Sequence, residues 1–217
     1  MIFYEIIENF IQNTKSTGAS WSDYLVIYEY VVTKKPRYIL ELGSGVSSVI
    51  FALANERVFN ETNRRIKIVS MESDRFYYKN IKELFPTSLS DFVDFNLSPN
   101  VFEMVCGITT SCYQNLPDFP YEFVFVDGPP AFDLCCGDAL KLILNADIEI
   151  DVITDRRIAT VSSFNRLFKP GVIGFDYIRN LGLGHKLSNK NLQLDCLNKS
   201  MHADHHDAFN FFGLASN

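Results

Sequence analysis

Ile-Leu-Glu-Leu-Gly-Ser-Gly-Val-Ser-Ser, residues 39–48, is the stretch that decides the fold of this chain. An apolar run that ends near an acid and passes through two glycines is typical of a buried strand that turns into a helix. Such a turn lets a ligand lie against bare backbone, and the helix N-terminus offers free N–H donors. The phosphate-binding form of the turn carries a third glycine, but Ser48 stands there, and Glu41 lies beside Gly43 and Gly45. A carboxylate attracts a cation and repels a pyrophosphate, so the stretch favours S-adenosylmethionine over NAD.

Strand-like and helix-like segments alternate along the chain without a linker between them. This alternation predicts one α/β domain with a mostly parallel sheet. We expect strands at residues 38–42, 66–71, 93–97, 121–126, 151–154 and 172–178, and a last, antiparallel strand at 209–214. We expect helices at residues 1–13, 21–33, 46–55, 75–84, 138–144 and 160–168. Residues 56–65 and 180–207 are polar and are expected to form loops, and residues 98–117 show no clear pattern.

The composition predicts a globular protein without a nucleic-acid partner. Hydrophobic residues make up 47% of the 217 residues and charged residues 21%, a balance that favours a folded, soluble domain over disorder. The net charge of −6 argues against nucleic acid, because neutralising phosphates requires a basic face. No apolar run reaches the roughly 18 residues of a membrane span, so we expect no membrane partner either.

The N-terminal residues and the cysteines predict a cytoplasmic protein. Residues 1–13 lack the basic start of a signal peptide and carry apolar residues at helical spacing, so we expect an amphipathic helix there. Five cysteines, an odd number without metal-ligand spacing, suggest reduced thiols. Three of the four histidines lie in residues 202–207. A polar surface loop, a metal patch and a general base are all open interpretations of that cluster.

Four predicted strands are followed by, or end in, an acid: Glu41, Glu72, Asp127 and Asp155. In an open α/β sheet, ligands bind outside the carboxyl ends of the strands, so these side chains are candidates for one site. A carboxylate at Glu72 can accept both hydroxyls of a ribose. The alternative for Glu72 is an N-cap of the next helix, shared with Ser73 and Asp74.

Two motifs resemble those of known methyltransferases. The glycine turn resembles the first motif of the class I S-adenosylmethionine-dependent methyltransferases, acid-x-Gly-x-Gly-x-Gly, with Ser47 in place of the third glycine. The segment YEFVFVDGPPA, residues 121–131, resembles the fourth-strand motif of a bacterial methyltransferase group typified by V-D-G-P-P. Plant glucuronoxylan O-methyltransferases look like distant members. The resemblance covers residues 20–178.

The resemblance implies a Rossmann-like α/β fold with a mostly parallel seven-stranded sheet, an antiparallel last strand, and helices on both faces. The whole chain, residues 1–217, is then one domain, in which residues 1–35 cover the cofactor cleft and residues 36–217 form the sheet core. The implied cofactor is S-adenosyl-L-methionine. The residues expected to bind it are Glu41, Gly43, Ser44, Gly45, Ser47, Glu72, Ser73 and Asp127.

Asp127 and Asp155 are the candidate catalytic residues, because methyl transfer to a hydroxyl needs positioning and a base. Catechol-type methyltransferases hold magnesium with aspartates at these two strand ends and with an Asn that follows the second. Here Arg156 follows Asp155 and would repel a cation, so no metal site is predicted. Arg156 and Arg157 form either a solvated helix start or an anchor for an anionic acceptor.

The leading hypothesis is a cytoplasmic S-adenosylmethionine-dependent O-methyltransferase with a small-molecule or sugar-containing acceptor. A binding protein of the same fold, without turnover, is the alternative. It is supported because residues 135–138, Cys-Cys-Gly-Asp, lack the basic residue that relatives carry after the double proline. An NAD-linked oxidoreductase is disfavoured by Glu41 and Ser48. Trp21 and Tyr24 are interpreted either as a cover for the cofactor cleft or as core residues.

Overall fold

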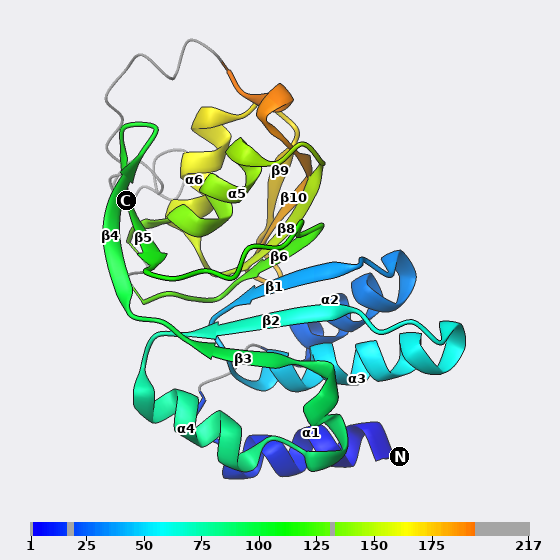
Figure 1. Ribbon diagram of the computed structural model, residues 1–217. Coiled ribbons are helices and arrows are strands. Elements are labelled where there is room, and N and C mark those ends of the chain that lie inside the picture. The colour runs from blue at the N-terminus through cyan, green and yellow to red at the C-terminus, as the bar shows by residue number, and fades with distance from the viewer. Residues whose placement is uncertain (1, 17–19, 131–132, 194–217) are drawn as a thin grey trace.

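The structure is a computed structural model that describes residues 2–16, 20–130 and 133–193. Seven strands form its main sheet (Figure 1): β1 (Tyr38–Leu42), β2 (Lys67–Glu72), β3 (Asp94–Leu97), β6 (Phe123–Val126), β8 (Ile150–Asp155), β9 (Ile173–Asp176) and β10 (Leu181–Leu187). The helices are α1 (Ile2–Asn13), α2 (Trp21–Lys34), α3 (Val46–Thr62), α4 (Arg75–Leu84), α5 (Gly137–Asn145) and α6 (Ile158–Leu167). Short 3-10 turns occupy η1 (Thr87–Phe92) and η2 (Asn189–Asn191).

The main sheet has the strand order β3-β2-β1-β6-β8-β10-β9. Neighbours from β3 to β8 are parallel, and β10 runs antiparallel to both β8 and β9. The predicted fold class is therefore confirmed: the sheet has seven strands, is mostly parallel and has one antiparallel strand. The strand order reverses on either side of β1, which pairs with β2 and with β6. This switch point is where open α/β sheets bind ligands.

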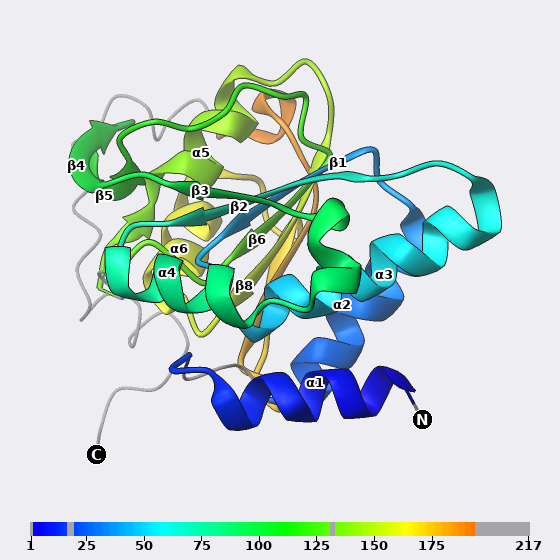
Figure 2. The same cartoon turned by 60° about the horizontal axis from the view of Figure 1, so that its bottom comes forward.

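Helices cover both faces of the sheet, with α1 to α4 on one side and α5 and α6 on the other (Figures 1 and 2). Alternate residues of one strand enter two cores: Ile39 packs with the first group of helices, and Leu40 packs with α5 and α6. Because both faces are covered, β6 is a continuous apolar run in the sequence, and β1 is apolar apart from Glu41. Among the helices that the structure describes, none is long and apolar enough to span a membrane.

Helix α3 is longer than the sequence predicted, because residues 56–65 were expected to form a loop. The helix continues to Thr62, with Val58 buried on its inner side. Its charged residues lie on the exposed face, where Arg57 Nε and Glu61 Oε1 form an ion pair at 2.6 Å with helical spacing. The helix ends at Asn63, whose φ of +55° is a left-handed cap.

Strand β10 lies in residues 180–207, which were expected to form a loop because they are polar; its own sequence, LGLGHKL, carries two glycines. A side chain at Gly182 would collide with Val161 of α6 and with Thr154 of β8. The glycine therefore allows α6 to approach the sheet and does not mark a turn. The expected last strand at 209–214 and the histidine cluster at 202–207 lie outside the described residues.

Residues 98–117, which showed no clear pattern, contain a β-hairpin of β4 (Asn100–Val105) and β5 (Ile108–Tyr113). Its two central turn residues, Cys106 and Gly107, both have positive φ angles, +51° and +75°. That geometry is the type I′ turn preferred in two-residue hairpins. The short strand β7 (Cys135–Cys136) joins β5 in parallel, so the hairpin becomes a second, three-stranded sheet beside α5.

Candidate active site

The two glycines of the turn after β1 are required by neighbouring parts of the protein. Gly43 has a φ of +102°, and a side chain there would lie 2.7 Å from the backbone nitrogen of Gly128. The turns after β1 and β6 therefore touch backbone to backbone. A side chain at Gly45 would lie 2.6 Å from Ser16 Oγ, in the segment that follows α1. The sequence explained these glycines by a ligand alone, whereas the structure adds two protein contacts.

Glu41 lies fully buried beneath the glycine turn. Its Oε2 accepts a hydrogen bond from Ser48 Oγ at 2.6 Å, and Ser48 Oγ also accepts one from the Gly45 N–H at 3.1 Å. Ser48 thus connects the acid to the turn, a role that the sequence treated only as a missing glycine. Burial raises the pKa of Glu41 to about 7, although the hydroxyls of Ser47, Ser48 and Ser70 oppose the rise. Its Oε1 is buried and has no hydrogen-bond partner among the described residues.

Glu72 is held in place through both of its carboxylate oxygens. Oε2 accepts from Ser44 Oγ at 2.9 Å, and Oε1 accepts the N–H groups of Ser73 and Asp74 at 2.7 and 2.9 Å. The N-cap of α4 is Asp74, which accepts from the backbone nitrogen of Phe76 at 2.6 Å. The capping role that was the alternative for Glu72 therefore belongs to Asp74. Glu72 and Ser44 connect the turns after β2 and β1.

Asp127 follows β6, and the loop after it is clamped by Arg157. The side chain of Arg157 is buried; it donates to the backbone oxygen of Pro129 at 2.9 Å and to the backbone oxygen of Asp127. Burial raises the pKa of the Asp127 carboxyl, and the positive charges of Arg157 and Arg156 oppose the rise. The interpretation of both arginines as a solvated helix start is thus wrong for Arg157, since its charge holds the loop after β6.

Asp155 ends β8, next to Asp127, because β6 and β8 are parallel and Val126 pairs with Thr154. Its side chain is buried, and Oδ1 has no hydrogen-bond partner within the described part of the chain. Burial raises the pKa of Asp155 to about 6, and the nearby charges of Asp127 and Asp23 add to the rise. Arg156 and Arg157 oppose it. The structure therefore places the two predicted catalytic acids side by side at the carboxyl edge.

Asp23, whose charge acts on Asp155, was not predicted as a site residue from the sequence. This residue of α2 is 1% exposed, and its Oδ2 accepts the N–H and the hydroxyl of Ser20, both at 2.8 Å. The pair is a capping box, a signal that the spacing of Ser20 and Asp23 already carried. Tyr24 belongs to the core, and Trp21 lies at the surface, stacked on Tyr4 with ring centroids 4.9 Å apart.

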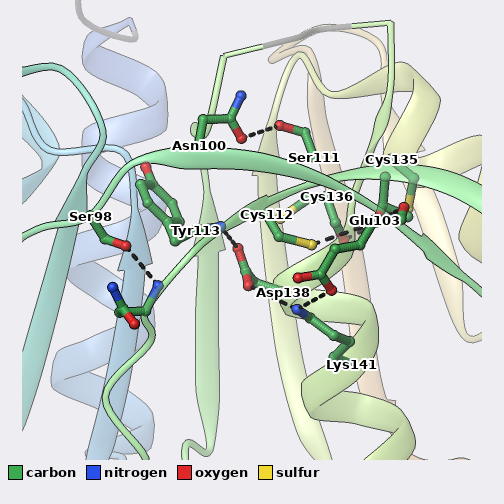
Figure 3. Close-up of polar contacts among 12 residues, drawn as sticks. Ser98, Asn100, Glu103, Ser111, Cys112, Tyr113, Cys135, Cys136, Asp138 and Lys141 are labelled. Atoms are coloured by element: carbon green, nitrogen blue, oxygen red, sulfur yellow. Dashed lines mark hydrogen bonds and ion pairs between the residues drawn. The ribbon is translucent and has the colours of Figure 1, made fainter.

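Tyr113 brings the hairpin to the same edge of the sheet. A side chain at Gly128 would lie 2.6 Å from the Tyr113 hydroxyl. This hydroxyl also donates a hydrogen bond to the backbone oxygen of Met71 at 3.4 Å. The backbone N–H of Tyr113 donates to Asp138 Oδ2 at 2.7 Å (Figure 3). Burial raises the pKa of Asp138 to about 6. The carboxylate of Asp138, at the start of α5, therefore fixes the end of β5 at the site.

The same close-up shows how the hairpin is held against α5. Lys141 of α5 forms an ion pair with Glu103 of β4 at 2.9 Å and lies 3.8 Å from Asp138 (Figure 3). The helix after the double proline does carry a basic residue, but this one is used in hairpin packing. The thiols of Cys106, Cys112, Cys135 and Cys136 are all free. Across the described ranges, no three His, Cys, Asp or Glu side chains are placed to hold a metal ion.

Comparison with known proteins relates the chain to solved methyltransferase structures. No family model matches the sequence, and no curated protein matches it either. A methyltransferase from Geobacter sulfurreducens is 14% identical with a TM-score of 0.55, over 86% of this chain and 90% of that one. A putative O-methyltransferase from Klebsiella pneumoniae is 13% identical with a TM-score of 0.51, over 85% and 90%. The cofactor-bound protein Rv0187 from MTB is 12% identical with a TM-score of 0.55, over 87% and 89%. The chain thus has the Rossmann-like fold of these methyltransferases.

Proposed function

We propose that this chain is an S-adenosylmethionine-dependent methyltransferase that methylates a hydroxyl group of a small-molecule or sugar-containing acceptor in the cytoplasm. One observation carries the proposal: Glu41, Glu72, Asp127 and Asp155 lie along one edge of the sheet around its switch point, and Glu72 is hydrogen-bonded to the glycine turn through Ser44. The similarity of the fold to solved methyltransferases supports it. The V-D-G-P-P segment supports a place beside the bacterial group that carries this motif.

The residues present fit S-adenosylmethionine better than a dinucleotide. Glu41 Oε1 is a buried acceptor without a hydrogen-bond partner in the described part of the chain, and a cationic donor would satisfy it. A pyrophosphate would instead be repelled by the carboxylates of Glu41 and Glu72. When bound, S-adenosylmethionine supplies a methyl group on a positively charged sulfur. In this proposal the cofactor is held by Glu41, Gly43, Ser44, Gly45, Ser47, Glu72, Ser73 and Asp127.

The segment that follows α1 supports a role for residues 1–35 as a cover for the cofactor cleft. Ser16 lies against Gly45, since a side chain at position 45 would come within 2.6 Å of Ser16 Oγ. The neighbouring Lys15 donates its N–H to Asn80 Oδ1 of α4 at 3.0 Å. These two contacts join the N-terminal segment to the turn after β1 and to the helix after β2.

Asp155 is the proposed general base. With a pKa of about 6, its carboxylate is mostly ionised at pH 7, yet it is basic enough to take a proton from a hydroxyl as the reaction proceeds. Among the described residues its buried Oδ1 accepts no hydrogen bond and has only the long ion pair with Arg156, so in this proposal the acceptor hydroxyl bonds there. The neighbouring carboxyl of Asp127 raises the pKa of Asp155 and so increases its basicity. Asp127 therefore supports the base as well as lining the cofactor side.

Two measurements test the proposal. Calorimetry should show binding of S-adenosylhomocysteine and none of NAD; the reverse result would indicate an oxidoreductase. Incubation with methyl-labelled donor and a library of hydroxyl compounds should then give labelled product. Binding of S-adenosylhomocysteine without any labelled product would favour a binding protein of the same fold. That alternative has one structural argument: Arg156 lies 3.7 Å from Asp155 and partly neutralises the proposed base.

A further inference from the structure

Two adjacent arginines at the start of α6 have opposite surroundings. Arg157 is 3% exposed, and its guanidinium donates to backbone oxygens of the loop after β6. The side chain of Arg156 is 62% exposed, and its Nε lies 3.7 Å from Asp155 Oδ1. Within the described residues, this long ion pair is the only polar contact of the Arg156 side chain. A guanidinium has five N–H donors, so Arg156 has most of its donors available to a ligand.

The backbone holds Arg156 in a fixed position beside Asp155. Its φ of +51° is in the left-handed region, which is sterically unfavourable for a non-glycine residue. The conformation is kept by a hydrogen bond from its N–H to the backbone oxygen of Asn180 at 2.9 Å. The N–H of Ile158 donates in turn to the oxygen of Arg156 at 3.0 Å. Strained backbone of this kind is concentrated at functional sites.

The turn between β9 and β10 places apolar side chains at the same edge. Leu181, the first residue of β10, pairs with both Asp155 and Asp176, so the turn lies next to the proposed base. Asp176 Oδ1 accepts the N–H groups of Ile178 and Arg179 at 3.0 and 3.1 Å, which fixes the shape of the turn. Tyr177 is 54% exposed and Ile178 is 91% exposed. The edge therefore combines a buried base, an exposed cation and an exposed apolar surface.

We propose that Arg156 binds an anionic group of the methyl acceptor, and that the acceptor is therefore a hydroxyl compound that also carries a carboxylate, sulfate or phosphate. The inference rests on the proposed function and adds the class of acceptor. The different depths of the two charges set its orientation: the anion pairs with exposed Arg156, and the hydroxyl reaches inward to buried Asp155. Tyr177 and Ile178 then contact the ring or chain between the two groups. An acceptor anion on Arg156 also draws this cation away from the base.

Matched acceptor pairs test the inference. Catechol is compared with 3,4-dihydroxybenzoate, and methyl glucopyranoside with its uronate, so that each pair differs only in a carboxylate. The anionic member of at least one pair should have the higher kcat/KM, by about tenfold, since a charge-assisted pair contributes that much to affinity. The preference should weaken as ionic strength rises, because the guanidinium is exposed. Equal or better turnover of the neutral member in both pairs would overturn the inference.

Three variants assign the preference to Arg156. Arg156→Met should bring kcat/KM for the anionic member down to that for the neutral member, mainly by raising KM, and Arg156→Lys should restore part of the difference. Arg57→Met is the matched control, because Arg57 is 60% exposed and paired with a carboxylate, but lies on α3 away from the site. A preference that survives in Arg156→Met would contradict the inference.

Binding of the same compounds, measured by calorimetry with and without S-adenosylhomocysteine, separates the two proposals. If wild type binds the anionic members through Arg156 but transfers no methyl group, the anion site stands and the enzyme proposal fails. If wild type transfers methyl groups without regard to charge, the enzyme proposal stands and the anion site fails. If wild type neither binds nor prefers the anionic members, the inference about Arg156 is wrong.

Discussion

The ends of β2 and β8 each carry a carboxylate at the same edge of the sheet, but the protein holds the two in opposite ways. Glu72, at the end of β2, has both oxygens hydrogen-bonded to Ser44 and to backbone N–H groups. Asp155, at the end of β8, has a buried oxygen with no hydrogen bond to any described residue, and its pKa is raised to about 6. Fixed acceptors of the first kind suit a binding group, whereas an unbonded, more basic carboxylate suits proton transfer.

The comparison assigns different tasks to the two halves of the sheet. The half with β2 and β1 is preorganised by hydrogen bonds between its turns, as expected where a ligand must be positioned. The half with β6 and β8 holds Asp155, an imperfectly satisfied acid, between Asp127, Asp23 and two arginines. Glu41, beneath the glycine turn, is the acid of the first half that shares this state. A buried carboxylate oxygen without a hydrogen bond is destabilising unless a ligand uses it.

Asp155→Asn should have the largest effect. The amide has the same shape but cannot accept a proton, so methyl transfer should fall by about 10²–10⁴-fold while S-adenosylhomocysteine binds as in wild type. Turnover of the anionic and neutral acceptors measures the loss of methyl transfer, and calorimetry on the same preparation measures the affinity for S-adenosylhomocysteine. A variant with nearly normal turnover would show that the unbonded carboxylate is not the base.

Glu72→Ala should weaken cofactor binding by at least about tenfold, since each hydrogen bond to a charged group contributes roughly 1.5–3 kcal/mol. Calorimetry with S-adenosylhomocysteine measures the effect. Asp74→Ala is the control, because Asp74 caps α4; its loss should cost about 1 kcal/mol of stability and leave affinity unchanged. If the Glu72 variant loses stability alone, the fixed carboxylate is structural.

Glu41→Gln should increase stability at high pH and reduce cofactor affinity. The folded-state pKa of Glu41, about 7, lies above its ordinary value of 4.5, so the folded protein binds the extra proton. Stability is therefore lost as pH rises from about 4.5 through 7, and glutamine removes this loss. Urea unfolding at pH 5 and pH 8 measures the free energy of unfolding of both proteins. The difference between variant and wild type should rise by on the order of 1 kcal/mol from pH 5 to pH 8, in favour of the variant. A difference that does not change with pH would mean that the acid does not titrate in this range.

The pH profile should show the smallest effect. Activity should fall as pH drops below about 6, because protonated Asp155 cannot act as a base. Arg156 lowers the pKa of Asp155, whereas Asp127 and Asp23 raise it. Arg156→Met should therefore move the acid limb of kcat/KM for a neutral acceptor slightly towards higher pH. A shift towards lower pH would contradict the assignment of the limb to Asp155.

The part of the fold that could be predicted from the sequence is the part encoded locally. Strands β1, β6 and β8 are short, mostly apolar segments with defined ends, and the glycine turn after β1 is a signal within ten residues. Glu41, Glu72, Asp127 and Asp155 were found because each lies near or directly after the end of such a run. Their placement at one edge then follows from the parallel arrangement of the strands.

The rest depends on contacts between distant residues. Strand β10 was not predicted, because residues 180–207 are polar and nothing nearby in the sequence reveals that α6 would collide with any side chain at position 182. Ser48 acts across the glycine turn, where it donates to Glu41. Arg157 acts on another part of the chain, the loop after β6. The hairpin was missed although residues 101–113 carry a Cys-Gly turn between two runs of strand-forming residues.

Among the strands that the structure describes, β10 is the last of the main sheet in the sequence, but it lies inside the sheet, between β8 and β9. Strand β10 pairs with β8 directly, whereas in the described part of the chain β9 joins the sheet only through β10, so β9 cannot add before β10. While the chain is being synthesised, the edge of β8 next to Asp155 therefore stays unpaired until residue 187 has left the ribosome. The proposed catalytic side is thus completed after the cofactor side, whose strands β1 and β2 are made early. A nascent chain shorter than this exposes the edge of β8 as a template for pairing with other chains.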